Sequence, residues 1–444
     1  MSPDAESVYD GHTLRAEEAA VLKDLAAEVM AKGHLKAGEA LPGASEDRFE
    51  VLGGRQARPL GFYSEHGSVL ALSLRNCDLA YFPDTLGQLT HLRQLDLTGN
   101  KLSNLPPSIG KITSLQSLYL DDNQATSFPT SIEDLAGLRE LHLDKNQLVS
   151  LPPNLDRLKR LERLNVRANR LSTIPESLGS LLALEDLRLG GNFLSRVPDS
   201  LWNLVNLKTL DLSENSLPSI SARIGGLAGL QMLDLGHNEL TSIPESMGNL
   251  TALSGYLYLS HNRLTSIPAS LGNLKKLAYL NVTDNELTFV PDSMGNMTRL
   301  KELRLYNNRL GSLPETLGNL ADLRELHLQN NKLKSLPESV GRLQNLRELR
   351  LQDNCLEALP ESIGSLTRLT QLDLRNNQLS ELPNSMGKLS NLTHLDLRSN
   401  RFVSLPAGIG DLANLEKLDL RWNKLSVLPA WIQRLEQRGC VVLR

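Results

Sequence analysis

The sequence predicts an α/β solenoid, a fold in which short equivalent coils stack along one axis. A pattern of Leu, Asn and Pro recurs sixteen times at a period of 23 residues, with one step of 24 residues between Asn238 and Asn262. Within each copy a Leu-x-Leu segment alternates, so both leucines point to one side of a short strand. Because one copy cannot bury its leucines alone, neighbouring copies are expected to share a continuous core.

Each fixed position of the copy has a physical reason, as the segment LRELHLQNNKLKSLPESVGRLQN that begins at Leu323 shows. Asn331 follows the strand, where its amide needs partners that the backbone of the adjacent coil supplies. The pair Leu336-Pro337 ends strand pairing, because proline has no N–H and its fixed φ suits the start of a helical turn. So short a return segment predicts helical or 3₁₀ turns on a convex face and parallel β-strands on a concave face.

This pattern resembles the leucine-rich repeat, L-x-x-L-x-L-x-x-N/C-x-L, over about residues 68–438. The form LP-x-x-L/I-G-x-L-x-x-L is similar to the repeats of intracellular Ras-group and scribble-type proteins and of similar bacterial proteins. The resemblance implies a leucine-rich-repeat horseshoe whose concave sheet binds other proteins. Because such scaffolds serve many partners, the resemblance does not name the partner.

We expect two parts, an N-terminal helix and loop in residues 1–67 and a solenoid of sixteen repeats in residues 68–444, with a short C-terminal cap at 439–444. Apolar residues at helical spacing predict a helix that starts near Thr13 and ends at Gly33, and the glycine-rich segment after it is expected to be loop. One hypothesis is that the helix covers the open end of the first coil, since terminal repeats need covers. The alternative is a helix for partner binding or targeting.

Composition excludes several classes of function. A net charge of -4 argues against a general nucleic-acid binder, which needs a concentrated basic face. Cys77, Cys355 and Cys440 lack metal-ligand spacing and favour a reducing compartment. No signal peptide and no membrane-length apolar run is found. We therefore expect a monomeric cytoplasmic protein without membrane insertion; secretion without a cleavable signal peptide is the alternative.

Function is expected on the concave face, where residues between and after the strand leucines are free of packing constraint. We predict that a protein partner contacts these residues of that face: Tyr119, His142, Arg188, Tyr256, Tyr258, Tyr279, Arg304, Tyr306, His327, Arg350 and Trp422.

The 24-residue copy, LSGYLYLSHN, is the first region of interest within this face. One added residue near Gly255 predicts a β-bulge, which re-aims neighbouring side chains. The tyrosines on this strand and the next two, with Arg304 beside them, are of the residue types enriched at binding hot spots. The alternative is a tolerated insertion with ordinary exposed tyrosines.

The repeated DLR segments near the C-terminus are the second region. They place three aspartates in one column and three arginines in the next, at Asp373, Asp396, Asp419, Arg375, Arg398 and Arg421. They form either a self-neutralised, solvated ladder or a site for a partner of matching charge. On the outer turns, Trp202 replaces the usual glycine and predicts either an exposed secondary contact or a side chain lying over its neighbour.

No catalytic constellation is found: the sequence holds no P-loop, GxSxG or HExxH motif. His237 and His261 are near enough to meet but have no third ligand, so we expect no metal and no cofactor. The prediction is a non-catalytic protein-binding scaffold or adaptor. A bacterial effector or host-interaction protein that binds a foreign target is the alternative, and a regulatory module of an enzyme complex is a weaker one.

Overall fold

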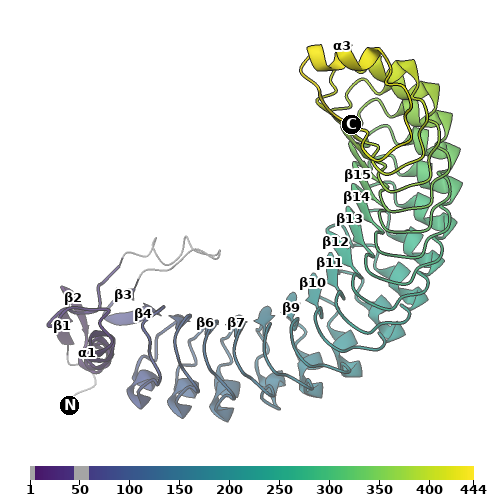
Figure 1. The fold of residues 1–444 in the computed structure, drawn as a ribbon. Helices are drawn as coiled ribbons and strands as arrows, with labels where there is room; N and C mark the ends of the chain where they lie inside the picture. The colour runs from purple at the N-terminus through teal and green to yellow at the C-terminus, as the bar shows by residue number, and fades with distance from the viewer. Residues whose placement is uncertain (1–5, 45–59) are drawn as a thin grey trace. The chain divides into compact units, whose positions relative to one another are not determined.

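The computed structural model describes residues 6–44 and 60–444. The chain forms two compact units, Met1–Ser216 and Leu217–Arg444, and each is described by itself. Part of the glycine-rich segment after the first helix lies outside the described residues. In both units short strands and short 3₁₀ turns alternate along the chain (Figure 1).

The first unit begins with a β-hairpin and a helix. Strands β1 (Glu6–Tyr9) and β2 (His12–Arg15) pair antiparallel, and α1 (Ala16–Ala31) follows directly. The helix therefore starts three residues later than the prediction of Thr13, because that residue is paired in β2. Its predicted end is confirmed, since Gly33 has a φ of +82°, a conformation that glycine adopts without strain.

Strand β3 (Gly61–Glu65) pairs antiparallel with β4 (Ser68–Ser73), so the expectation of loop throughout this segment was wrong. Hydrogen bonding to the free edge of β4 orders residues whose glycine content indicated a loop. From β4 onward the neighbouring strands of this unit pair in parallel: β5 (Gln94–Asp96), β6 (Ser117–Tyr119), β7 (Glu140–His142), β8 (Arg163–Asn165), β9 (Asp186–Arg188) and β10 (Thr209–Asp211). Between them lie 3₁₀ turns: η1 (Asp84–Gln88), η2 (Pro107–Lys111), η3 (Thr130–Asp134), η4 (Leu155–Arg157), η5 (Glu176–Ser180) and η6 (Asp199–Asn203).

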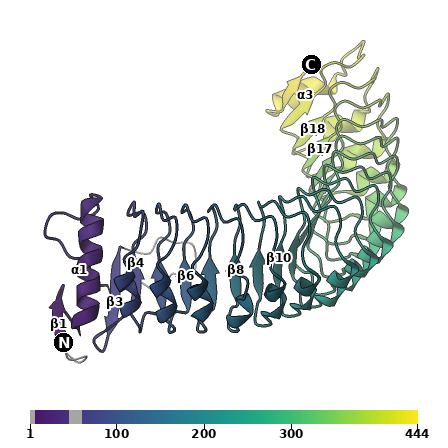
Figure 2. The same ribbon diagram turned by 90° about the horizontal axis from the view of Figure 1, so that it is seen from below.

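Helix α1 stands beside the first strands of its unit (Figure 2). Its apolar face, which includes Leu22, Leu25 and Val29, is buried. At its C-terminal half, the hydroxyl of Tyr81 donates to a Glu28 carboxylate oxygen at 2.5 Å. The helix thus packs against the first coil, as the covering hypothesis expects, while the domain boundary at residue 67 stays a prediction.

The second unit repeats the same coil. Its neighbouring strands pair in parallel: β11 (Met232–Asp234), β12 (Tyr256–Tyr258), β13 (Tyr279–Asn281), β14 (Glu302–Arg304), β15 (Glu325–His327), β16 (Glu348–Arg350), β17 (Gln371–Asp373), β18 (His394–Asp396), β19 (Lys417–Asp419) and β20 (Val441–Leu443). Its turns are η7 (Ala222–Gly226), η8 (Glu245–Asn249), η9 (Ala269–Asn273), η10 (Asp292–Asn296), η11 (Glu315–Asn319), η12 (Glu338–Arg342), η13 (Glu361–Ser365), η14 (Asn384–Lys388) and η15 (Ala407–Asp411), with α3 (Trp431–Gln437) before β20. Within this unit the strands line the inner side of the curve and the turns its outer side (Figure 1).

The fixed positions of the repeated copy have the structural roles that the sequence predicts. The Asn331 amide nitrogen donates to the carbonyls of Leu305 and Leu328 at 3.0 Å each, and its oxygen accepts from the N–H of Leu310 at 3.0 Å. Pro337 precedes η12 with a φ of -67°. The asparagine column therefore ties successive coils through their backbones, and the predicted solenoid of parallel strands and 3₁₀ turns is confirmed.

The structure decides between the two interpretations of Trp202 on the outer turns. Trp202, on η6, is only 3 % exposed, so it offers no secondary contact surface. The second interpretation of this residue, a large side chain covered within the stack of turns, is the one that the structure supports.

Candidate functional site

The extra residue of the 24-residue copy forms a bulge at the start of β12, as predicted. The N–H groups of Ser254 and Gly255 both donate to the carbonyl of Gln231, at 3.3 and 3.1 Å, whereas Leu257 pairs with Leu233. Gly255 and the tyrosine after it therefore stand together opposite a single residue, Met232. A Cβ on Gly255 would lie 2.8 Å from the Met232 Cγ and 3.3 Å from the Gln231 carbonyl oxygen, so a larger residue there would force the Met232 side chain to shift.

The bulge brings aromatic rings together on the inner face of β12 and β13. The rings of Tyr256 and Tyr258 stack with centroids 4.4 Å apart and an interplanar angle of 21°. The Tyr258 and Tyr279 rings meet edge to face at 5.2 Å and 72°. The guanidinium carbon of Arg304, on β14, lies 5.3 Å from the Tyr279 ring centroid. All three contacts have favourable geometry for aromatic or cation–π interaction. We call Tyr256, Tyr258, Tyr279, Arg304 and Tyr306 the tyrosine–arginine cluster.

The cluster is held in one arrangement by charge and burial. Arg304 Nε donates to Glu302 Oε1 at 2.5 Å. Burial raises the pKa of Tyr258 and Tyr279, so both phenols stay neutral at physiological pH. Tyr306, on the turn after β14, is half-buried. A rigid, uncharged aromatic surface beside one fixed cation results.

Next to the cluster a column of glutamates crosses three strands. Glu302, Glu325 and Glu348 lie in register on β14, β15 and β16. Arg350, a predicted contact residue, is ion-paired with Glu348 of its own strand. His327 Nε2 lies 3.3 Å from Glu325 Oε2. Burial is the largest cause that lowers the pKa of the His327 imidazole, and the positive charge of Arg350 lowers it further.

The expectation that the central column is free of packing constraint needs correction. His327 is only 6 % exposed, Asp211 is 0 % exposed and Asp419 is 2 % exposed, although all three point away from the leucine core. Closely spaced strands on the inner side of a curve crowd their side chains, so long neighbours cover short ones. The concave face is therefore partly a second packed layer.

Three of the predicted residues lie in the first unit. The hydroxyl of Tyr119 donates to Glu140 at 2.5 Å, and its ring centroid lies 4.6 Å from that of His142. Arg188 donates through Nε and Nη2 to the two carboxylate oxygens of Asp186 on its own strand, at 2.8 Å each. These residues form local polar contacts, whereas the tyrosines of β12 and β13 form a broader aromatic surface.

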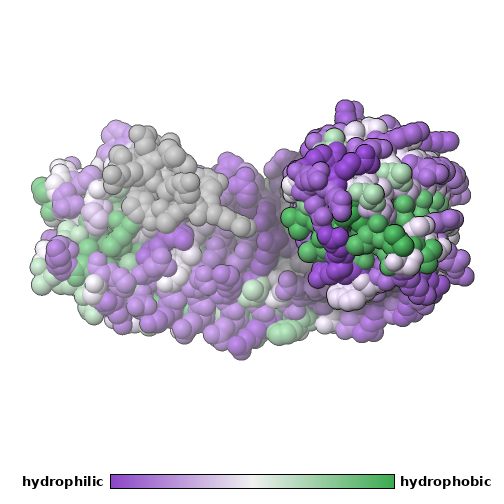
Figure 3. Space-filling model, turned by 45° about the horizontal axis from the view of Figure 1, so that its top comes forward, coloured by the Kyte–Doolittle hydropathy of each residue, from purple (hydrophilic) through white to green (hydrophobic). Residues whose placement is uncertain are grey.

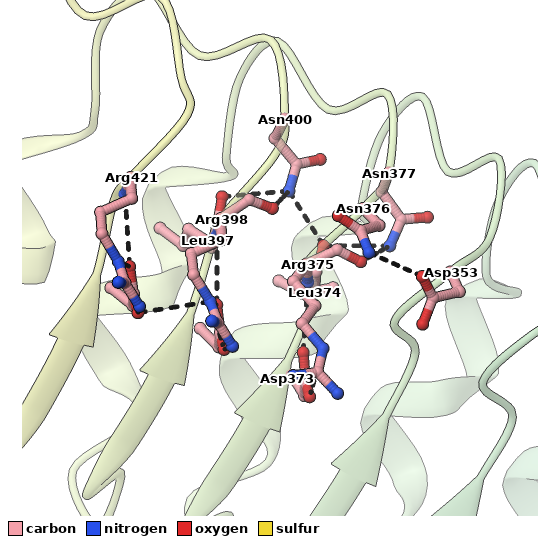
Figure 4. A network of polar contacts seen from close by, with 12 residues as sticks. Asp353, Asp373, Leu374, Arg375, Asn376, Asn377, Leu397, Arg398, Asn400 and Arg421 are labelled. Carbon is pink, nitrogen blue, oxygen red and sulfur yellow. Dashed lines mark hydrogen bonds and ion pairs between the residues drawn. The ribbon is translucent and has the colours of Figure 1, made fainter. Parts of the chain in front are cut away.

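The aspartate–arginine ladder near the C-terminus is largely self-neutralised (Figure 4). Arg398, just after β18, donates through Nε to Asp396 of the same copy, and this nitrogen lies 3.3 Å from Asp419 of the next copy. Arg421 donates through Nη2 to Asp419 at 2.7 Å. Burial raises the pKa of Asp373 to about 6. A pocket of about 280 Å³ opens between Arg350, this aspartate and Lys417. The pairing supports the ladder interpretation over a charged partner site.

Trp422 is the most exposed of the predicted residues, at 69 %, and lies on the turn after β19 with a φ of +59°. The Arg421 guanidinium carbon lies 5.3 Å from its ring centroid. Val427 and Leu428 are also exposed, and Figure 3 shows hydrophobic surface on the unit that contains the C-terminus. Trp422 is thus the predicted contact residue that is most accessible to a partner.

The histidines of adjacent copies do meet. The rings of His237 and His261 stack with centroids 4.0 Å apart, and His261 Nε2 lies 3.3 Å from Asp284 Oδ2. The glutamate column, in contrast, was missed by sequence reasoning. The sequence did contain a pattern that predicts this column. Residues two apart on a strand share a face, so Glu325 must lie on the same face as His327.

Family models match most of the chain. A leucine-rich repeat region matches residues 65–195, 195–284 and 334–437, and a leucine rich repeat matches 275–333. This chain belongs to the leucine-rich-repeat family. The predicted resemblance is therefore confirmed.

Solved structures of other leucine-rich-repeat proteins are similar to this one. A leucine-rich-repeat protein of Leptospira interrogans is 36 % identical, with 84 % of this chain and 94 % of that chain covered and a TM-score of 0.76. A plant peptide hormone receptor, RGFR1 in complex with RGF2, is 30 % identical over 84 % of this chain and 70 % of that chain, with a TM-score of 0.67. An internalin of Listeria monocytogenes is 25 % identical over 73 % and 85 %, with a TM-score of 0.57. A comparison with curated proteins found no match.

Leucine-rich-repeat proteins commonly act as non-catalytic scaffolds for protein interaction, and their curved sheets supply the binding surface. None of the helices in the described part of this leucine-rich-repeat protein is long and apolar enough to cross a bilayer.

Proposed function

We propose that this leucine-rich-repeat protein is a non-catalytic scaffold or adaptor that binds another protein through the tyrosine–arginine cluster. The observation that supports the proposal best is the row of contacts in which the Tyr258 ring touches the rings of Tyr256 and Tyr279. Arg304 lies over the Tyr279 ring, and the leucines of these strands point into the core, away from this face. The partner is a folded protein or an extended segment that offers apolar groups to the rings and an acceptor to the arginine.

Several physical features favour this surface as the contact. Tyrosine gives a large contact area with few rotatable bonds, so binding costs little side-chain entropy. The rings already touch, and short strands of a continuous sheet hold their backbones. Little reorganisation is then required when a partner docks, which improves affinity.

The proposal includes a monomer and a cytoplasmic location. All three cysteines carry free thiols, which fits a reducing compartment. Secretion without a cleavable signal peptide is the alternative, and detection of the full-length chain in culture supernatant, with a cytoplasmic marker absent, would favour it.

A second candidate function is that of a bacterial effector or host-interaction protein with a foreign target. The similarity to proteins of Leptospira and Listeria favours it. It uses the same face, so the two candidates differ in the origin of the partner and not in the contact residues.

The test replaces Tyr258 and Tyr279 with Ala together. Proteins retained from native lysate by the wild type, measured by quantitative mass spectrometry, should fall at least about 10-fold, since such residues each contribute more than ~1 kcal/mol at hot spots. Tyr81→Ala, an exposed tyrosine of the other unit that is not among the predicted contact residues, is the control and should retain them. Unchanged capture by the double variant, with an unchanged melting temperature, would show that this surface is wrong.

A further inference from the structure

Two adjacent strands of the second unit bring three metal-ligating side chains together. On β15, Glu325 and His327 lie two residues apart and face the same side. On β14, Glu302 is the register partner of Glu325. One ligand atom from each of the three side chains lies within 4.8 Å of the other two. Glu302 shares β14 with Arg304 of the tyrosine–arginine cluster, whereas Glu325 and His327 lie on the next strand, outside that cluster.

The charges of this region favour a cation. Three carboxylates lie side by side in the glutamate column, an unfavourable arrangement. Arg304 is ion-paired with Glu302 and Arg350 with Glu348, while the ion-pair partner of Glu325 is a histidine.

His327 adds a nitrogen ligand beside this column. Its Nε2 lies 3.3 Å from Glu325 Oε2, so an imidazole nitrogen and a carboxylate oxygen already face each other at a separation that one coordinated ion can bridge.

We propose that Glu302, Glu325 and His327 form a binding site for a divalent transition-metal ion, with Zn²⁺ as the best fit. Imidazole together with carboxylates suits zinc, whereas Mg²⁺ and Ca²⁺ are bound mainly by oxygen. Arg304 holds one oxygen of Glu302, and a carboxylate keeps a second oxygen for the ion. Three protein ligands leave a coordination position on the concave side for water or for a side chain of a bound protein.

The chain contains its own control for this site. The first unit carries the same tripeptide on β7, Glu140-Leu141-His142. There the register partner on the preceding strand is Ser117 instead of a glutamate, and the partner on the following strand is Arg163. Histidine and glutamate are the same in both places, so the two places differ in the residues of the neighbouring strands, which supply a second carboxylate only in the second unit.

The experiment titrates the tag-free, chelator-treated full chain with Zn²⁺ by calorimetry and with Co²⁺ by visible absorption. Glu325→Gln and His327→Gln should each weaken binding by about 100-fold, and Glu302→Gln by at least about 10-fold, because even second-layer partners of a metal contribute factors of this size. His142→Gln should leave binding unchanged. Affinity in the wild type should also rise with pH, because protons compete for the ligands.

Two results would overturn the proposal. One is a wild-type chain that binds neither ion. The other is binding that survives Glu302→Gln and Glu325→Gln or that falls equally in His142→Gln. The glutamate variants keep the size of side chains that lie outside the leucine core, so they separate loss of a ligand from loss of the fold, which circular dichroism checks for each variant.

Discussion

The buried carboxylate of Glu18, on α1, accepts a hydrogen bond from the Val69 N–H of β4 at 2.6 Å. The side chain is 0 % exposed, and its other oxygen has no hydrogen-bond partner in the described residues. That oxygen lies 3.7 Å from His91 Nδ1. Burial raises the pKa of Glu18 from 4.5 to about 7, so the helix is joined to the first coil through a group that titrates near neutrality.

This relationship predicts a pH-dependent stability. A raised folded-state pKa gives stability that is complete below the unfolded value of 4.5 and is lost as pH rises through about 7. The shift corresponds to about 3 kcal/mol. Chemical denaturation of wild type and Glu18→Gln at pH 5 and pH 8 should therefore show the wild type losing stability relative to the variant by about this amount. Glu17→Gln, on the exposed side of the same helix, should follow the wild type at both pH values.

The leucine core predicts a second outcome. Leu326 is 0 % exposed in the middle of β15, and Leu326→Ala should lower the free energy of unfolding by about 2–5 kcal/mol. His327→Ala was expected from the sequence to cost little. Its 6 % exposure now predicts an intermediate loss of about 1 kcal/mol. Urea denaturation of both variants checks the order, and equal losses would contradict the assignment of core and concave layers.

The asparagine column predicts a third outcome. Asn331→Ala leaves the buried N–H of Leu310 without its acceptor and removes one of two asparagine donors from the carbonyls of Leu305 and Leu328, so it should destabilise the chain by about 1–3 kcal/mol. Asn330→Gly is the control, since Asn330 is exposed and has a φ of +54°, which glycine tolerates. If thermal melts show similar losses for both variants, the column does not hold the coils together.

The bulge predicts a fourth outcome. Deleting Gly255 restores the 23-residue period, so the fold should survive while the tyrosine rings lose their stacking. The near-ultraviolet circular dichroism of tyrosine should change, and the melting temperature should stay within a few degrees. Deleting Arg324 from a regular copy instead shortens that copy to 22 residues and shifts the strand register, so it should be strongly destabilising.

Repetition explains how much of the fold could be predicted. A leucine that recurs in fixed phase, such as Leu326, has one stable place, because each coil must bury it against the next. The turn positions were equally predictable, since proline at a residue such as Pro337 cannot continue the strand. In the site, the bulge followed from a single added residue near Gly255, which changes the period visibly.

Other features were not predictable, because they depend on contacts between residues outside the repeat or between copies. The spacing of apolar residues around Gly61 does not predict β3. This strand forms because the edge of β4 is open for pairing beside it. For Trp202 the sequence left an exposed contact and a covered side chain both open, and the choice depends on how neighbouring side chains cover it. The glutamate column was overlooked because it is seen only when strands 23 residues apart are aligned.

By itself the sequence determined the type of coil, the number of its repeats and the face on which side chains vary, because local alternation and period decide these. The tertiary structure decided which of the varied side chains remain accessible and which groups meet. Tyr258 meets Tyr279, and Glu302 meets His327, only across neighbouring strands. Contacts of that kind are set by strand register, bulging and crowding on the inner side of the curve, and these properties belong to the stacked coils together.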